Sequence, residues 1–244
     1  MTATPAGMTY ADYLHLDELL SAQQPLSGLH DEMLFIVIHH SKELWLKQML
    51  HEVALAISLV RQDRFAETYK ALSRVSRIQS VMTLSWEVLS TLTPVDYSAF
   101  RDVLGTSSGF QSAQFRELEY RLGIKDPKFL DFYEGGSAGH ARLVKAMDDP
   151  SLWDEANAAL ERAGAESWLA VYQDAERWFE LYQLAEKLVD IDDALSSWRH
   201  KHVLTVERII GMKPGTGGSS GVAYLASTLT KRAFPELWSL RTDL

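Results

Sequence analysis

The chain has 244 residues, of which 46% are hydrophobic and 23% charged, and its formal net charge is −9. This length is enough to bury the core of one domain. The acidic balance, without a cluster of lysines or arginines, argues against nucleic acid and anionic membranes as partners. The chain has no cysteine, which excludes disulfides, cysteine-based zinc sites and thiol nucleophiles.

The N-terminal residues lack the basic and then apolar regions of a signal peptide. No apolar stretch approaches the ~20 residues that span a bilayer. The sequence therefore predicts a cytoplasmic protein without a membrane partner.

Apolar residues recur at steps of three and four over residues 30–62, which predicts one long helix. A second helix is expected from Pro94, with Thr93 as its N-cap and Gly105 as its stop. A third is expected over 190–211, ending near Gly211. Further helices are predicted around 65–91, 111–122, 153–164 and 167–189.

Two segments interrupt this pattern. Residues 134–140 have the composition of a surface loop, and we expect a small helical insertion around 125–165. Residues 211–225 form a glycine- and serine-rich stretch between apolar segments. There is no internal repeat and no run of alternating strands. The predicted fold is all-α, one bundle-like helical domain over 1–244.

Two histidine pairs stand out on the predicted helices. On a helix, His39 shares a face with Phe35, whereas His40 points roughly 100° away. His39 is therefore either a core histidine bonded to a backbone carbonyl or a site residue, and the pattern leaves both open. The same choice holds for His202, which lies on a more apolar stripe than His200; a lone imidazole in an apolar pocket is also a proximal haem ligand.

Two further features could bind an anion. Tyr97 and Arg101 lie four residues apart, where a guanidinium and a phenol could hold a carboxylate or could form an exposed pair without function. The "KPGTGGSSG" stretch lacks the Walker pattern. It is either a flexible linker or a mobile loop over a site, with Thr216 as its most useful side chain.

Longer motifs resemble the tryptophan 2,3-dioxygenase family over nearly the whole chain. They are "YADYLHLDELLSAQ", "HDEMLFIVIH", "YSAFRDVLGTSSGFQSAQFRELEYRLG", "WRHKHVLTVERIIGMKPGTGGSSGVAYL" and "FPELW". The resemblance implies an all-helical homotetramer that binds haem b, active as Fe2+. It also implies that O2 and L-tryptophan react by cleavage of the indole C2–C3 bond to N-formylkynurenine, in tryptophan catabolism by the kynurenine pathway.

The resemblance also implies roles for individual residues. His202 would bind the haem iron and Trp86 would belong to the haem pocket. His39 would accept a hydrogen bond from the indole N–H. The remaining residues would contact the substrate, with the three N-terminal ones reaching a neighbouring subunit's site: Phe35, Tyr97, Arg101, Ser108, Thr216, Tyr10, Tyr13 and Leu14.

One stretch departs from the family, which usually has "HQT" or "HQA" where this chain has "HHSK". His40 and Lys42 are either harmless changes on the other face of the helix or marks of an altered reaction. The altered reaction would be insertion of one oxygen into tryptophan or β-methyltryptophan, giving an oxindole. The sequence also leaves open a haem-binding sensor, which has no need of an amino-acid clamp, and a purely structural helical bundle.

Overall fold

The computed structural model describes residues 7–244, and within this range every regular element is helical. The α-helices are α1 (Tyr10–Leu14), α2 (Leu16–Ser21), α3 (His30–Arg61), α4 (Phe65–Leu89), α5 (Pro94–Phe100), α6 (Ala113–Leu122), α7 (Ala138–Asp148), α8 (Leu152–Ala163), α9 (Trp168–Gln173), α10 (Phe179–Ile210), α11 (Val222–Ser227) and α12 (Pro235–Ser239). Short 3-10 helices are η1 (Arg101–Leu104), η2 (Gly109–Gln111), η3 (Pro127–Phe132) and η4 (Leu240–Thr242). The predicted all-α fold is confirmed.

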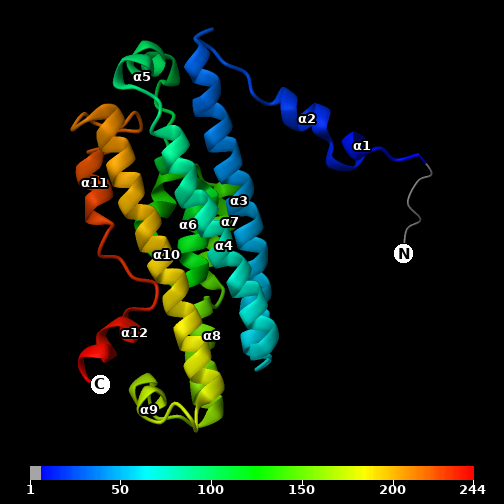
Figure 1. Ribbon diagram of the computed structural model, residues 1–244, viewed down its shortest axis with the longest axis vertical. Helices are drawn as coiled ribbons and strands as arrows, with labels where there is room; N and C mark the ends of the chain where they lie inside the picture. The colour runs from blue at the N-terminus through cyan, green and yellow to red at the C-terminus, as the bar shows by residue number, and fades with distance from the viewer. Residues whose placement is uncertain (1–6) are drawn as a thin grey trace.

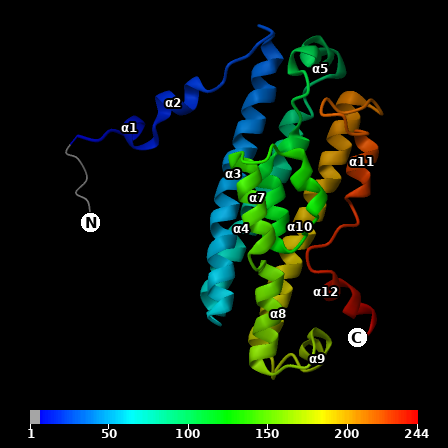
Figure 2. The same ribbon diagram turned by 180° about the vertical axis from the view of Figure 1, so that it is seen from behind.

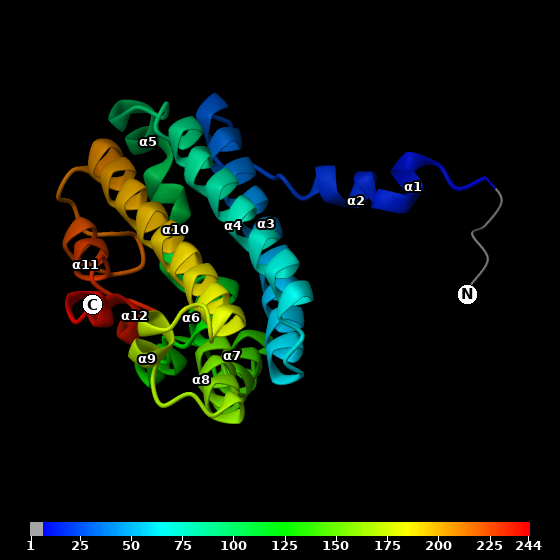
Figure 3. The same ribbon diagram turned by 60° about the horizontal axis from the view of Figure 1, so that its bottom comes forward.

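Three long helices form the body, with α4 packed between α3 and α10 (Figure 1). Seen from behind, α6, α7 and α8 cover the other side of this layer (Figure 2). The view from below shows the same arrangement (Figure 3). The chain thus buries the apolar stripes of its long helices against one another and against the second group of helices.

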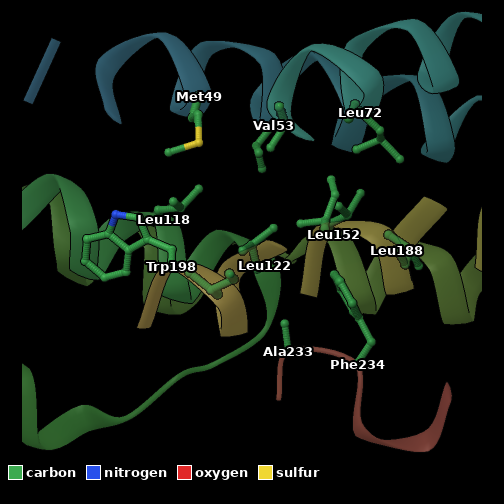
Figure 4. Close-up of a cluster of buried hydrophobic side chains, with 14 of the residues drawn as sticks. Met49, Val53, Leu72, Leu118, Leu122, Leu152, Leu188, Trp198, Ala233 and Phe234 are labelled. Carbon is green, nitrogen blue, oxygen red and sulfur yellow. The ribbon is translucent and has the colours of Figure 1, made fainter. Parts of the chain in front are cut away.

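The spacing of apolar residues explains why α4 can sit in the middle. Its buried side chains include Ala71, Val75, Ile78 and Met82, which recur at steps of three and four and line one face. A single large core runs from α3 and α4 to α10 and the C-terminal segment around Phe234. Figure 4 shows part of it, where side chains from these elements meet.

Local signals set the helix ends that were predicted from the sequence. The Thr93 side chain accepts a hydrogen bond from the Asp96 backbone N–H, and Pro94 begins α5. Gly105 and Gly211 end η1 and α10 with positive φ angles of 54° and 60°, which glycine adopts without steric cost. The second predicted helix is, however, split between α5 and the 3-10 helix η1.

One predicted boundary is wrong. Residues 167–189 and 190–211 were expected as separate helices, but α9 ends at Gln173 and α10 continues from Phe179 to Ile210. In the structure Asp192 is fully buried, and one carboxylate oxygen accepts from the Ala233 and Phe234 N–H groups and the Trp238 indole.

Three elements fill the region of the expected insertion, namely η3, α7 and α8. A small satellite core joins α6, η3 and α7 through Tyr120, Phe129, Leu143 and Ala146, whereas α8 packs on α3 and the main core. The single-domain assignment and the insertion stay predictions.

The first two helices extend away from the body in all three views (Figures 1–3). Neither α1 nor α2 has a buried residue. None of the helices in residues 7–244 is both long and apolar enough to cross a bilayer.

Candidate active site

A cavity of about 230 Å³ lies at the end of the body where α3 begins and where α4 and α10 end. The helices form one wall, which we call the helix wall and define as His39, Lys42, Trp86 and His202. The segments 101–112 and 213–221 lie across from it, and we call them the loop wall. The fold therefore brings residues far apart in the sequence around one space.

The ring of His39 is held in one orientation on the helix wall. Its Nδ1 lies 2.7 Å from the Phe35 carbonyl oxygen. A neutral imidazole that donates from Nδ1 has a free acceptor at Nε2. Burial lowers the pKa of His39 from its usual 6.5, which favours the neutral ring. The ring thus bonds a backbone carbonyl, as in the core interpretation, and also lines the cavity, whereas its role as a site residue stays a prediction.

His202 faces the same cavity from α10. Its ring stacks on Trp86, with centroids 4.3 Å apart and planes at 12°. Burial lowers its pKa to about 3, so the ring is neutral. Within residues 7–244 no group hydrogen-bonds to this imidazole, and it keeps partial accessibility through the cavity. An unprotonated ring nitrogen is therefore available to a ligand.

The neighbouring histidine differs. His200 Nδ1 lies 2.8 Å from the Ser196 carbonyl oxygen, and its side chain does not line the cavity. Of the pair on α10, only His202 is placed to act on a bound molecule.

Two hydrogen bonds hold the loop wall together. The Arg101 guanidinium donates to the Pro214 carbonyl at 2.5 Å, and the Thr216 hydroxyl donates to the Ser107 carbonyl at 2.5 Å. The close approach needs Gly217, since a Cβ there would lie 2.7 Å from the Ser108 Cβ. The segment "KPGTGGSSG" is thus docked on residues 101–112.

The substrate residues implied by the resemblance are distributed unevenly. Phe35, Tyr97, Ser108 and Thr216 line the cavity, whereas Arg101 is not among the lining residues and donates to the Pro214 carbonyl. Tyr97 is buried, which raises the pKa of its phenol. The Phe35 ring lies between the two polar groups, 4.2 Å from His39 and 5.9 Å from Tyr97 between centroids.

Sequence reasoning missed a buried charge network on α6 and α10, beside the cavity. Arg116 Nη1 and Arg199 Nη2 donate to opposite oxygens of Glu119 at 2.6 and 2.8 Å, and all three side chains are buried and line the cavity. Two cations that share one carboxylate leave this side of the cavity electropositive. Nothing in the helical pattern of "FRELE" marks these residues as a site.

The unusual stretch "HHSK" divides between two environments. The interpretation that both changes lie on the other face of α3 is wrong for Lys42, which is 6% exposed and lines the cavity. Residue 42 lies three positions after His39 and therefore near the same face. His40 does lie elsewhere, with Nδ1 3.0 Å from the Gln23 amide of the N-terminal segment.

Tyr10, Tyr13 and Leu14 do not approach the cavity of their own chain. They lie on or near α1, where 76%, 71% and 39% of their surface is exposed.

Comparison with known proteins explains this constellation. A profile of the tryptophan 2,3-dioxygenase family matches residues 1–168 and 163–244. The chain belongs to the tryptophan 2,3-dioxygenase family. The tryptophan 2,3-dioxygenase of Caulobacter vibrioides is 61% identical over 97% of this chain and 98% of its own. That of Bacillus thuringiensis (strain 97-27) is 51% identical over 97% and 93%. That of Bordetella parapertussis is 48% identical over 97% and 91%.

The cavity fits the haem that this family uses. It presents a neutral imidazole without a partner among the described residues, His202, and a second imidazole, His39, with an aromatic ring beside each. A proximal histidine in an apolar pocket is a recurrent mode of haem ligation. The residues present are therefore suited to the group.

Proposed function

We propose that the protein is a haem-dependent dioxygenase that cleaves the indole C2–C3 bond of L-tryptophan with O2 to give N-formylkynurenine. Membership of the family and the identity of 61% to a named tryptophan 2,3-dioxygenase support the reaction. The observation that carries the proposal is that His39 on α3 and His202 on α10, each with a lowered pKa that favours the neutral ring, line one cavity.

His202 would hold the haem iron and Trp86 would pack beside it. Stacking on Trp86 fixes the orientation of the His202 ring, and with it the direction of the free ring nitrogen. When bound as haem b with Fe2+, the group would activate O2 for addition to the indole double bond.

His39 would orient the indole. Its Nδ1 donates to the Phe35 carbonyl, so Nε2 can accept the indole N–H. The Phe35 ring beside it provides an apolar surface for the flat substrate. His39 is thus an acceptor that positions the substrate, and no step requires it to remove a proton fully.

The loop wall would bind the amino-acid end of tryptophan. At the Arg101 guanidinium, the substrate carboxylate would take the place now held by the Pro214 carbonyl. Tyr97 would add a hydrogen bond, and Ser108 and Thr216 would contact the ammonium group. Because the loop docks through Thr216 and Ser107, it would also exclude water from the closed site.

We also propose a homotetramer, in which Tyr10, Tyr13 and Leu14 reach a neighbouring subunit. Their exposure on helices that extend from the body supports this arrangement. Light scattering of the intact chain measures the assembly directly, and a monomer would contradict it.

The reaction is tested by supplying the reduced, haem-loaded protein with L-tryptophan and 18O2. Mass spectrometry should find N-formylkynurenine carrying both labelled atoms. A product with one labelled atom would instead identify an oxindole-forming monooxygenase, and the absence of any product would contradict both.

A further inference from the structure

The Lys42 side chain is buried in the cavity without a partner for its charge. It is 6% exposed, and its Nζ has no hydrogen-bond partner among residues 7–244. The amine lies over the Trp86 ring, 2.9 Å from the centroid. Cation–π contact stabilises an ammonium only partly when water is removed.

The other charged groups around the cavity are already engaged. Arg116 and Arg199 both bond to Glu119. Glu43 Oε2 accepts from the Gln114 amide, and no salt bridge within the described chain joins Lys42 to a carboxylate. Three cationic side chains therefore face two carboxylates around the cavity, and Lys42 is the one without an anion.

This imbalance has a known physical cost. Burial lowers the pKa of the Lys42 amine to about 6, because the charged form has lost its water and gained no anion. A carboxylate placed beside the amine by a ligand would reverse that effect by restoring the charged form. The charged form of Lys42 is therefore stabilised when an anionic ligand enters the cavity.

The position of Lys42 indicates which ligand brings the anion. It lies one turn after His39 on α3 and contacts Trp86, which stacks on His202. A flat ligand that contacts both histidines would therefore lie beside Lys42 and Trp86, which come between them on the helix wall. The amino-acid carboxylate, in contrast, belongs to Arg101 on the loop wall.

We propose that Lys42 forms an ion pair with a carboxylate at the rim of the bound porphyrin. This inference rests on the proposed haem binding. It assigns to Lys42 a role in holding the cofactor, so this residue of the departure "HHSK" acts on cofactor affinity.

The test compares haem, which carries two propionates, with haem dimethyl ester, in which both are neutralised. Each is titrated into the full-length apo-protein and followed by Soret absorbance and by quenching of tryptophan fluorescence. The variants are Lys42→Met and Lys42→Gln, which remove the charge, and Lys42→Arg, which keeps it. Lys47→Met is the matched control, since Lys47 is exposed on the same helix.

The neutral variants should lose at least about tenfold in affinity for haem, because a desolvated pair is broken. They should bind the ester as the wild type does, and Lys42→Arg should retain much of the preference for haem. Equal losses for the two porphyrins, or none, would overturn the inference and leave Lys42 as packing. Raised KM for tryptophan with unchanged haem affinity would overturn it too, since the carboxylate would be the substrate's.

The ester titration also reports on folding. A neutral variant that binds the ester normally is folded, and if Lys42→Met does not fold then Lys42→Gln decides. If the wild type itself binds neither porphyrin, the proposed haem function fails, which is a different result from an equal response of the variants.

Discussion

The two walls of the cavity differ in how the chain holds them. The helix wall consists of side chains on α3, α4 and α10 that are packed in the core, and burial shifts the pKa values of His39, Lys42 and His202. The loop wall is joined by single hydrogen bonds to backbone carbonyls, at Arg101 and Thr216. This difference fits the proposed roles, in which the packed helix wall would hold a cofactor and the loop wall would bind the polar end of the substrate.

Removal of the proposed iron ligand from the helix wall should have the largest effect. We expect His202→Ala to lose haem, or to hold it without a fixed proximal ligand, as seen in the Soret spectrum. His200→Ala is the matched control because His200 lies two residues away, outside the cavity. A normal spectrum for His202→Ala with an altered one for His200→Ala would transfer the assignment.

On the loop wall, Arg101→Ala should raise KM for L-tryptophan by roughly thirtyfold or more, since a desolvated charge pair with the substrate carboxylate is lost. Haem content should stay at the wild-type level. Binding of indole, which has no carboxylate, should not change, and this is the internal control. An equal loss for indole would place Arg101 in the structure of the site rather than in recognition.

The burial of Lys42 can be measured in the apo-protein. Its pKa is about 6 when folded and 10.5 in the reference state, so between these values the unfolded chain binds the additional proton. The free energy of unfolding should therefore rise with pH from 6 toward 10.5, by up to about 1.4 kcal/mol per pH unit. Urea unfolding at pH 7 and pH 9 should show this slope in the wild type and a flatter one in Lys42→Met. Identical slopes would mean that Lys42 is hydrated.

The smallest expected effect concerns loop docking. Gly217→Ala would place a Cβ 2.7 Å from the Ser108 Cβ, and overpacking of this kind costs about 1–3 kcal/mol. KM for tryptophan should rise roughly fivefold or more while haem binding is unchanged. Gly135→Ala, where a Cβ would meet no atom within 4 Å, is the control. If haem binding falls instead, the two walls are not separable.

Much of the fold and part of the site followed from the sequence. The three- and four-residue spacing predicted α3 and α4, and Thr93, Pro94 and Gly211 marked helix ends, because these signals act within one or two turns. The same periodicity placed His39 and His202 on apolar faces. The roles of Arg101 and Thr216 came from family resemblance, and they stay predictions.

The tertiary structure alone decided what depends on contacts between distant segments. It brought His39 and His202 to one cavity, placed His40 beside Gln23 and left the Lys42 amine buried without a hydrogen-bond partner among the described residues. It also made α10 continuous through Asp192, whose carboxylate accepts from the Ala233 and Phe234 N–H groups about 40 residues further along the chain. Periodicity states which residues share a helix face, but the neighbour of that face, and so the burial of its charges, is set only when the helices pack.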